Sequence, residues 1–188
     1  MSAATLQASR KVNGIDMVAL KQLVQDSRDP RNAEVKFAVN TRWKGGALSE
    51  TRVDGYELGG QRIEREFSIH VDEPCELCGG NTQPNPQEML MAAFNACMLV
   101  GYVAGATVNG IKLEKLEIET RGKLDLRGFL GLDSTVKPGY DSLHYIVRIS
   151  GNGTREQFQK IHETVIATSP NRWNIANPIR LTSELVVG

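Results

Sequence analysis

The longest apolar run in the chain lies between Asn85 and Asn109, and its pattern predicts a long helix. Asn85 is a good N-cap, Pro86 suits the first helical position, and Glu88 stands where a capping box needs a carboxylate. Apolar side chains then cover almost every direction around the helix axis. A helix without a polar face is expected to be buried on all sides, so the rest of the chain should be organised around this one.

Elsewhere the hydrophobic pattern has a period of two, which is typical of half-buried strands. Gly-rich turns separate several of these stretches and favour antiparallel pairing. The expected strands run over residues 35–43, 48–58, 63–71, 116–126, 143–149 and 179–187.

Two shorter helices complete the pattern. Residues 15–27 have helical spacing, and a second helix starts at a capping box formed by Thr154 and Gln157 and ends at Ser169-Pro170. We therefore expect an N-terminal tail with a short helix over residues 1–33, followed by one domain over residues 34–188. The order of elements predicts an α+β fold with mostly antiparallel sheets.

Composition narrows the class of protein. The 188 residues suit one domain, and 22 Lys and Arg balance 22 Asp and Glu, so no basic excess points to nucleic acid. Asn95 interrupts the long apolar run, which favours a core helix over a membrane span. The N-terminus lacks the apolar run of a secretory signal, and three cysteines are too few for a disulfide scaffold. We expect a cytoplasmic, thiol-reducing location.

The three cysteines are the main candidates for chemistry. Cys97, in the middle of the long helix, is either a buried small hydrophobe or a reactive thiol. Cys75 and Cys78 form a C-x-x-C pair in the loop before that helix, and the pair has three interpretations. It is a dithiol that resolves or reduces Cys97, half of a zinc site whose nearest further ligand in sequence is His70, or two inert loop thiols.

The run NPQEMLMAAFNAC, followed by an amphipathic helix that ends at a residue–Pro pair, resembles the OsmC/Ohr family of osmotically inducible and organic-hydroperoxide-resistance proteins. The N-terminal helix resembles that of a longer OsmC-like branch. The resemblance implies an OsmC-like fold: an intertwined homodimer with two central helices, one from each chain, flanked by sheets that both chains build.

The resemblance also implies a peroxiredoxin-like function in oxidative-stress defence. In the family, the helix cysteine attacks an organic hydroperoxide as a thiolate, and a second cysteine closes a disulfide with the resulting sulfenic acid. Cys97 matches the first cysteine, but the second position holds Ser169. The family's Glu, which holds an activating Arg, is replaced by Gln87, ten residues before the cysteine.

The activating Arg itself cannot be placed by sequence register. Arg65 is the leading candidate because it falls on the apolar face of the third expected strand, and Arg42 and Arg52 are the others.

Two functions from different classes follow. The first is an organic hydroperoxide reductase with Cys97 as nucleophile, Cys78 or Cys75 as resolving thiol, and an external thiol reductant. The second is a non-catalytic dimer that binds a small apolar or thiol-reactive ligand around Cys97, which Ser169 and Gln87 favour. Neither function calls for a cofactor, a bound metal, nucleic acid or a membrane.

Overall fold

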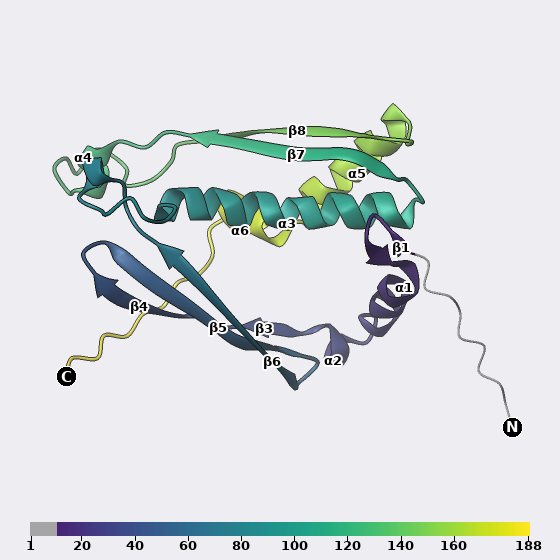
Figure 1. Ribbon diagram of the computed structural model, residues 1–188, viewed down its shortest axis with the longest axis horizontal. Helices are drawn as coiled ribbons and strands as arrows, with labels where there is room; N and C mark the ends of the chain where they lie inside the picture. Colours follow the sequence, from purple (N-terminus) through teal and green to yellow (C-terminus); the bar gives the residue numbers. More distant parts are fainter. Residues whose placement is uncertain (1–10) are drawn as a thin grey trace, which may run out of the picture. The chain divides into compact units, whose positions relative to one another are not determined.

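The computed structural model describes residues 11–188, which divide into two compact units at the boundary between Ala92 and Ala93 (Figure 1). The prediction for the N-terminal tail falls mainly on residues 1–10, which lie outside the described residues. The two units are described in turn.

The first unit begins with a short hairpin and two helices. These are β1 (Lys11–Val12), β2 (Ile15–Asp16), α1 (Met17–Asp26) and α2 (Pro30–Ala33). The helix expected over residues 15–27 is confirmed, but it starts at Met17. The reason is that the Asp16 side chain accepts hydrogen bonds from the backbone N–H groups of Val18 and Ala19 and so caps the helix there.

A four-stranded antiparallel sheet makes up most of the first unit. Its strands are β3 (Val35–Phe37), β4 (Asn40–Gly45), β5 (Leu48–Leu58) and β6 (Gln61–Val71). β6 pairs with one edge of β5, while β3 and β4 follow one another along the other edge. The single strand expected over residues 35–43 is therefore wrong. The pairing breaks opposite the stretch where β5 itself is irregular, between Val53 and Gly55.

Gly55 explains this irregularity. Its φ of +150° is a conformation that other residues rarely adopt, and an added Cβ would lie 2.5 Å from the carbonyl oxygen of Ile63. β5 and β6 thus approach too closely for a side chain, and the strand bends at a bulge.

The helix α3 (Pro86–Val108) starts in the first unit and runs through the second. Its predicted capping box is confirmed: Glu88 N–H donates to Asn85 Oδ1, and Asn85 N–H donates to Glu88 Oε2, each over 2.8 Å. The elements after it are β7 (Leu113–Gly122), α4 (Leu126–Phe129), β8 (Leu143–Gly151), α5 (Arg155–Thr168) and α6 (Pro170–Ala176).

The core of the second unit forms where α3, the β7–β8 hairpin and α5 meet (Figure 1). Four of the five buried residues of α3 recur every fourth position and so lie on one face: Phe94, Met98, Tyr102 and Ala106; Thr107 is the fifth. Gly101 and Gly105 let α5 come close, because an added Cβ would lie 3.1 Å from Val165 and 3.0 Å from Ile161 respectively.

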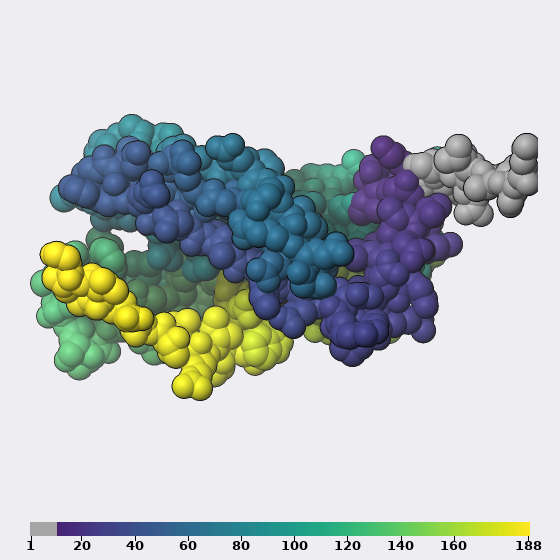
Figure 2. All heavy atoms as spheres, turned by 90° about the horizontal axis from the view of Figure 1, so that it is seen from below, coloured from purple at the N-terminus to yellow at the C-terminus, as the bar shows by residue number. Residues whose placement is uncertain are grey.

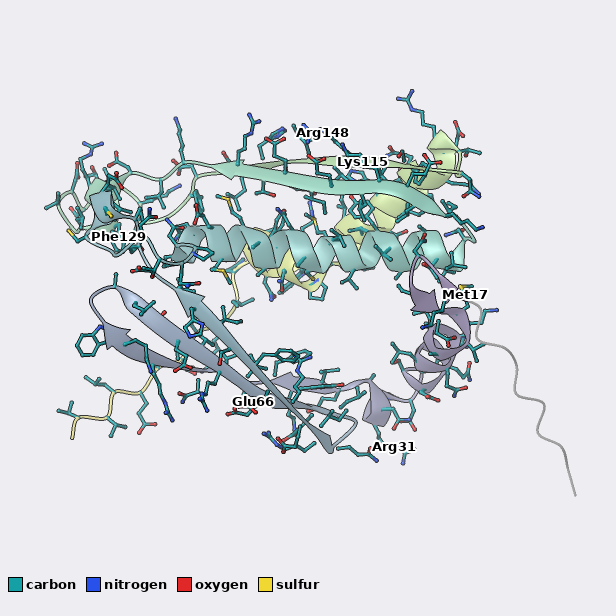
Figure 3. All side chains as sticks on the ribbon, viewed as in Figure 1. Met17, Arg31, Glu66, Lys115, Phe129 and Arg148 are labelled. Atoms are coloured by element: carbon teal, nitrogen blue, oxygen red, sulfur yellow. The ribbon has the colours of Figure 1, made fainter. Side chains whose placement is uncertain are left out.

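The outer face of the β7–β8 hairpin is charged. Lys115 and Arg148 both point away from α3 (Figure 3). Glu117 pairs with both of these cations, and Arg148 also reaches Glu119 over 3.0 Å. One face of this small sheet therefore packs in the apolar core, and the other face is exposed to solvent.

Two expectations for this unit are wrong. The strand expected over residues 116–126 ends at Gly122, because Asp125 caps the short helix α4 through a hydrogen bond from Arg127 N–H. No strand forms over 179–187 in the described chain: this segment has no partner strand, and it lies exposed at the surface, in yellow in Figure 2.

The burial of α3 on all sides, which the family resemblance attributes to the helix of a second chain, stays a prediction. Only one face of the helix is buried within the chain, whereas Leu99, Val100 and Val108 on the other faces are exposed.

Candidate functional site

Cys97 lies half-buried on α3, and its sulfur has a hydroxyl partner. The Ser169 hydroxyl donates to Cys97 Sγ over 3.4 Å. Ser169 is itself buried, with 6% of its surface exposed, so water competes little for this contact. The structure thus brings the predicted nucleophile together with the residue at the position of the family's second cysteine.

The backbone at two helix ends fixes the position of Ser169. Its N–H donates to Val165 O and ends α5, while its C=O accepts from Trp173 N–H and starts α6. Asn171, in the first turn of α6, donates to the carbonyl oxygen of Ala93, one turn before Cys97 on α3. This hydrogen bond of 2.8 Å ties α6 to the segment that carries the thiol.

Asn95, the polar residue in the middle of α3, has a structural role. Its carboxamide oxygen accepts a hydrogen bond from the Thr120 hydroxyl over 2.5 Å, and its Nδ2 donates to Ile118 O over 3.3 Å. Both partners lie on β7, so Asn95 fixes the helix against the strand. Its polar groups are satisfied without water.

The buried Tyr102 of α3 pairs with the half-buried His162 of α5. The Tyr102 hydroxyl lies 2.5 Å from His162 Nδ1 on α5. Burial, and secondly the neighbouring Tyr145, raise the pKa of Tyr102 to about 12, although Arg172 acts in the opposite direction. The hydroxyl of Tyr102 therefore keeps its proton near neutral pH.

A cavity of about 680 Å³ opens beside this pair, between β8 and α5. Tyr102, His162 and Phe158 contribute to its lining, and Arg155 adds a positive charge. Cys97 is not among the residues that line this cavity.

Arg172 is a site residue that the sequence did not single out. It lies half-buried on α6, where its Nε donates to the Tyr145 hydroxyl over 3.2 Å and its Nη1 donates to Ile166 O over 3.0 Å. Among residues 11–188, no carboxylate forms an ion pair with it. The unit that contains Cys97 thus carries a half-buried positive charge that no acid neutralises.

Cys75 and Cys78 are both exposed, at the ends of a single turn in the first unit. Cys75 begins the 3-10 helix η1 (Cys75–Leu77), and Cys78 follows it in the left-handed conformation with φ 64°. Both thiols are free.

Asp72 organises the loop around these cysteines. Its carboxylate is buried and accepts hydrogen bonds from the N–H groups of Glu73, Gly80 and Thr82 and from the Thr82 hydroxyl. The hydroxyl of Thr82, followed by the backbone of Thr82, lowers the pKa of Asp72 to about 2. The Gly and Asn content of this loop suggests mobility. The carboxylate of Asp72, at the start of the loop, nevertheless binds Gly80 and Thr82 near its end and holds the loop in place.

Gln87 and Arg65 also belong to the first unit. Gln87 is half-buried, ten residues or about 15 Å of helix rise before Cys97, so it cannot touch that sulfur within one chain. The Arg65 guanidinium lies over the rings of Tyr56 and Phe67, at 5.2 and 5.4 Å from their centres. The roles of Gln87, Arg65 and the cysteine pair at Cys97 stay predictions.

The structure places no further zinc ligands beside Cys75 and Cys78 among residues 11–188. Within residues 11–188, no three or more His, Cys, Asp or Glu side chains group together in a way that could hold a metal ion.

The fold and the site define a class: an α+β protein with antiparallel sheets and one half-buried thiol on a long apolar helix. A family model described as "OsmC-like protein" matches residues 79–184, which is more than half of the chain and includes α3, Cys97 and Ser169. This protein belongs to the OsmC-like family. No curated protein sequence matches the chain.

Solved structures have the same fold at low sequence identity. An OsmC-like protein from Mycoplasma pneumoniae is 14% identical over 75% of this chain and 87% of its own, with a TM-score of 0.58. A putative osmotic stress induced and detoxification response protein from Psychrobacter arcticus 273-4 is 13% identical over 71% and 84%, with a TM-score of 0.53. An OsmC-like protein of unknown function from Vibrio cholerae is 15% identical over 73% and 91%, with a TM-score of 0.52.

The long apolar helix does not make this a membrane protein. α3 is long and apolar enough to cross a bilayer, but the core helix of a soluble protein passes the same test. One face of α3 lies in the core of the second unit, and proteins of the OsmC-like family are generally soluble.

Proposed function

We propose that this protein is a thiol-dependent reductase of organic hydroperoxides, with Cys97 as the nucleophile. The observation that carries the proposal is the buried Ser169 hydroxyl 3.4 Å from the sulfur of Cys97. Thiolate, not thiol, is the nucleophile in such reactions, and a donor aimed at the sulfur favours the charged form. Membership of the OsmC-like family supports the same chemistry.

The reaction begins when the Cys97 thiolate attacks the terminal oxygen of the hydroperoxide. An S–O bond forms while the O–O bond breaks, and the leaving alkoxide takes up a proton to become the alcohol. Sulfur is oxidised to the sulfenic acid as the hydroperoxide is reduced. A thiol then condenses with the sulfenic acid and releases water, and a second thiol reduces the resulting mixed disulfide.

The source of the resolving thiol separates this chain from its two-cysteine relatives. Serine at position 169 cannot form a disulfide, so an external thiol or the pair Cys75 and Cys78 has to react with the oxidised Cys97. A cytoplasmic, reducing compartment would supply that external thiol.

The active form is a homodimer in this proposal. The exposed Leu99, Val100 and Val108 leave part of an almost wholly apolar helix in water. Covering such a face with a second copy removes apolar surface from water at about 25 cal/mol per Å². Sedimentation at micromolar concentration tests this, and a stable folded monomer would contradict it.

The enzymatic test uses reduced protein, cumene hydroperoxide and dithiothreitol. We expect steady consumption of the hydroperoxide and a sulfenic acid at Cys97 that reacts with dimedone and is identified by mass spectrometry. The matched control is Cys97→Ser. Equal consumption by the wild type and this variant would refute the proposal.

A binding function is the alternative, and the cavity between β8 and α5 favours it. A volume of about 680 Å³ is within the range of small-molecule sites, and Arg155 suits an anionic head group. In that case decanoate should raise the melting temperature of the wild type and of Cys97→Ser equally, while neither protein consumes hydroperoxide.

A further inference from the structure

Cys75 and Cys78 lie one turn apart in a segment whose backbone brings their Cα atoms together. Cys78 N–H donates to the carbonyl oxygen of Cys75 over 3.0 Å and closes a four-residue turn. Such a turn keeps its first and last Cα atoms less than about 7 Å apart. A disulfide joins Cα atoms about 4.4–6.8 Å apart, so the turn suits a bond between these two sulfurs.

The two side chains are also accessible. Cys75 begins the single 3-10 turn, and Cys78 directly follows this turn in the left-handed conformation. Both residues are exposed, whereas Cys97 is only partly so. Dissolved thiols and disulfides can therefore reach this pair without any opening of the core.

The backbone hydrogen bonds around the cysteine pair are already formed while both thiols are reduced. Gly79 N–H donates to Pro74 O and Asn81 N–H donates to Glu73 O, so the chain closes on both sides of the turn. An added Cβ at Gly79 would lie 1.8 Å from the carbonyl oxygen of Glu73. This tight packing, together with the hydrogen bonds on Asp72, holds the turn in place before any sulfur–sulfur bond forms.

We infer that Cys75 and Cys78 form a reversible disulfide with each other, and that this couple exchanges electrons with small-molecule thiols and disulfides. The couple lies on a different element from Cys97 and does not depend on the peroxide chemistry proposed above.

The exchange balances with a small disulfide as the oxidant. One cysteine thiolate attacks a sulfur of the small disulfide, whose S–S bond breaks, and the first small thiolate leaves and takes up a proton. The second cysteine thiolate then attacks the mixed disulfide and expels the second small thiolate. The protein loses two electrons and two protons, and the small disulfide becomes two thiols. An excess of small thiol reverses both steps.

The test uses the full chain with Cys97→Ser, equilibrated with defined ratios of glutathione and glutathione disulfide and then alkylated. No Lys or Arg lies between Arg65 and Lys112, so trypsin alone leaves all three cysteine positions in one peptide. Cleavage after Glu76 by a glutamate-specific protease separates Cys75 from Cys78. Only a disulfide between them then holds the two fragments together.

We expect the joined fragments, with no more than about a tenth of the protein carrying one glutathione at any ratio, because the second attack is intramolecular. The matched control, Cys75→Ser with Cys97→Ser, has no partner sulfur and should accumulate the glutathione adduct at Cys78. Wild-type protein mapped in the same way shows whether the pair forms when Cys97 is present.

Three results would overturn the inference. In the first, both cysteines are alkylated at glutathione ratios where the control variant is glutathionylated. In the second, disulfides form only between different chains. In the third, the reduced pair retains zinc in stoichiometric amount. Loss of hydroperoxide consumption in Cys97→Ser bears on the proposed function alone, so the two proposals fail separately.

Discussion

The chain holds its cysteines in two contrasting environments. Cys97 lies half-buried on a long helix and has an oxygen as its partner, the Ser169 hydroxyl at 3.4 Å. Cys75 and Cys78 lie exposed at the two ends of one short turn, whose backbone is closed by the hydrogen bond from Cys78 N–H to Cys75 O. In our two proposals, the same side chain attacks peroxide in one environment and exchanges disulfides in the other, because the partner and the access of a thiol control its reactivity.

The forces that maintain the two environments also differ. Apolar packing of α3 against α5 and the β7–β8 hairpin positions Cys97, and no ionised group is needed for it. Hydrogen bonds to the ionised carboxylate of Asp72 position the cysteine turn. Acid should therefore loosen the turn before it disturbs the helix.

The largest expected effect is the loss of Cys97. Cys97→Ser should lower hydroperoxide consumption by on the order of 10³-fold or more, because removing a nucleophile ends the covalent pathway. Cys75→Ser with Cys78→Ser should leave the initial rate within about threefold of the wild type, since neither sulfur attacks the peroxide. Peroxide consumption in excess dithiothreitol measures both rates.

The same double variant also tests resolution. Without a small thiol, wild-type protein should form a bridge from Cys97 to Cys75 or Cys78, and the double variant should proceed to sulfinic acid. Equal rates of sulfinic acid formation, followed by mass spectrometry, would leave the cysteine pair without a resolving role.

The next effect comes from placing a second sulfur beside the helix thiol. Ser169→Cys should form a disulfide between positions 97 and 169 after one equivalent of hydroperoxide, because the Ser169 side chain already contacts the Cys97 sulfur. Peptide mapping detects it. Thr168→Cys is the matched control, since the Thr168 hydroxyl donates to Thr164 O on an exposed part of the helix. Equal yields of bridged protein from the two variants would show that contact with the sulfur is irrelevant.

A smaller effect should follow from removing the hydroxyl alone. Ser169→Ala deletes one hydrogen bond to sulfur, which is worth about 1.5 kcal/mol when the acceptor is charged, or roughly a tenfold slower reaction with hydroperoxide. Thr168→Ala, which leaves the sulfur's partner in place, should react at the wild-type rate. An unchanged rate for Ser169→Ala would mean that the hydroxyl does not assist the thiolate.

The smallest effect concerns pH and the cysteine turn. The pKa of Asp72 is lowered to about 2 in the folded protein, so its contribution to stability is complete above the unfolded value of 3.8 and is lost as the pH falls through 2. The protection of the Gly80 and Thr82 amides against hydrogen exchange, relative to the intrinsic exchange rate at each pH, should fall severalfold over that interval. In Asp72→Asn the exchange should be fast already at pH 5. Equal protection in both proteins would contradict this role for Asp72.

Local sequence signals predicted the fold well where they acted alone. Both capping boxes form as expected, at Asn85 with Glu88 and at Thr154 with Gln157, and β5 covers the predicted residues 48–58. Local signals do not reveal whether a segment with a strand pattern has a partner strand to pair with. The segment 179–187 alternates like a strand but has no strand beside it in the chain.

The site could be predicted only in part. The thiol of Cys97 and the serine at position 169 followed from the family resemblance, and the structure brings them together. Arg172 was missed together with α6, although Ser169-Pro170 is as good a helix start as it is a helix end. The role of Asp72 was missed because its partners lie up to ten residues away, and one acid in a loop carries no periodic signal.

The charged outer face of the β7–β8 hairpin has a consequence for the behaviour of the protein in solution. Lys115, Glu117, Arg148 and Glu119 neutralise one another locally, and the whole chain has a formal net charge of zero. Two molecules that approach each other therefore meet no long-range repulsion for dissolved ions to screen. Self-association of this protein should vary little with ionic strength, and colloidal stability must come from hydration of the paired charges.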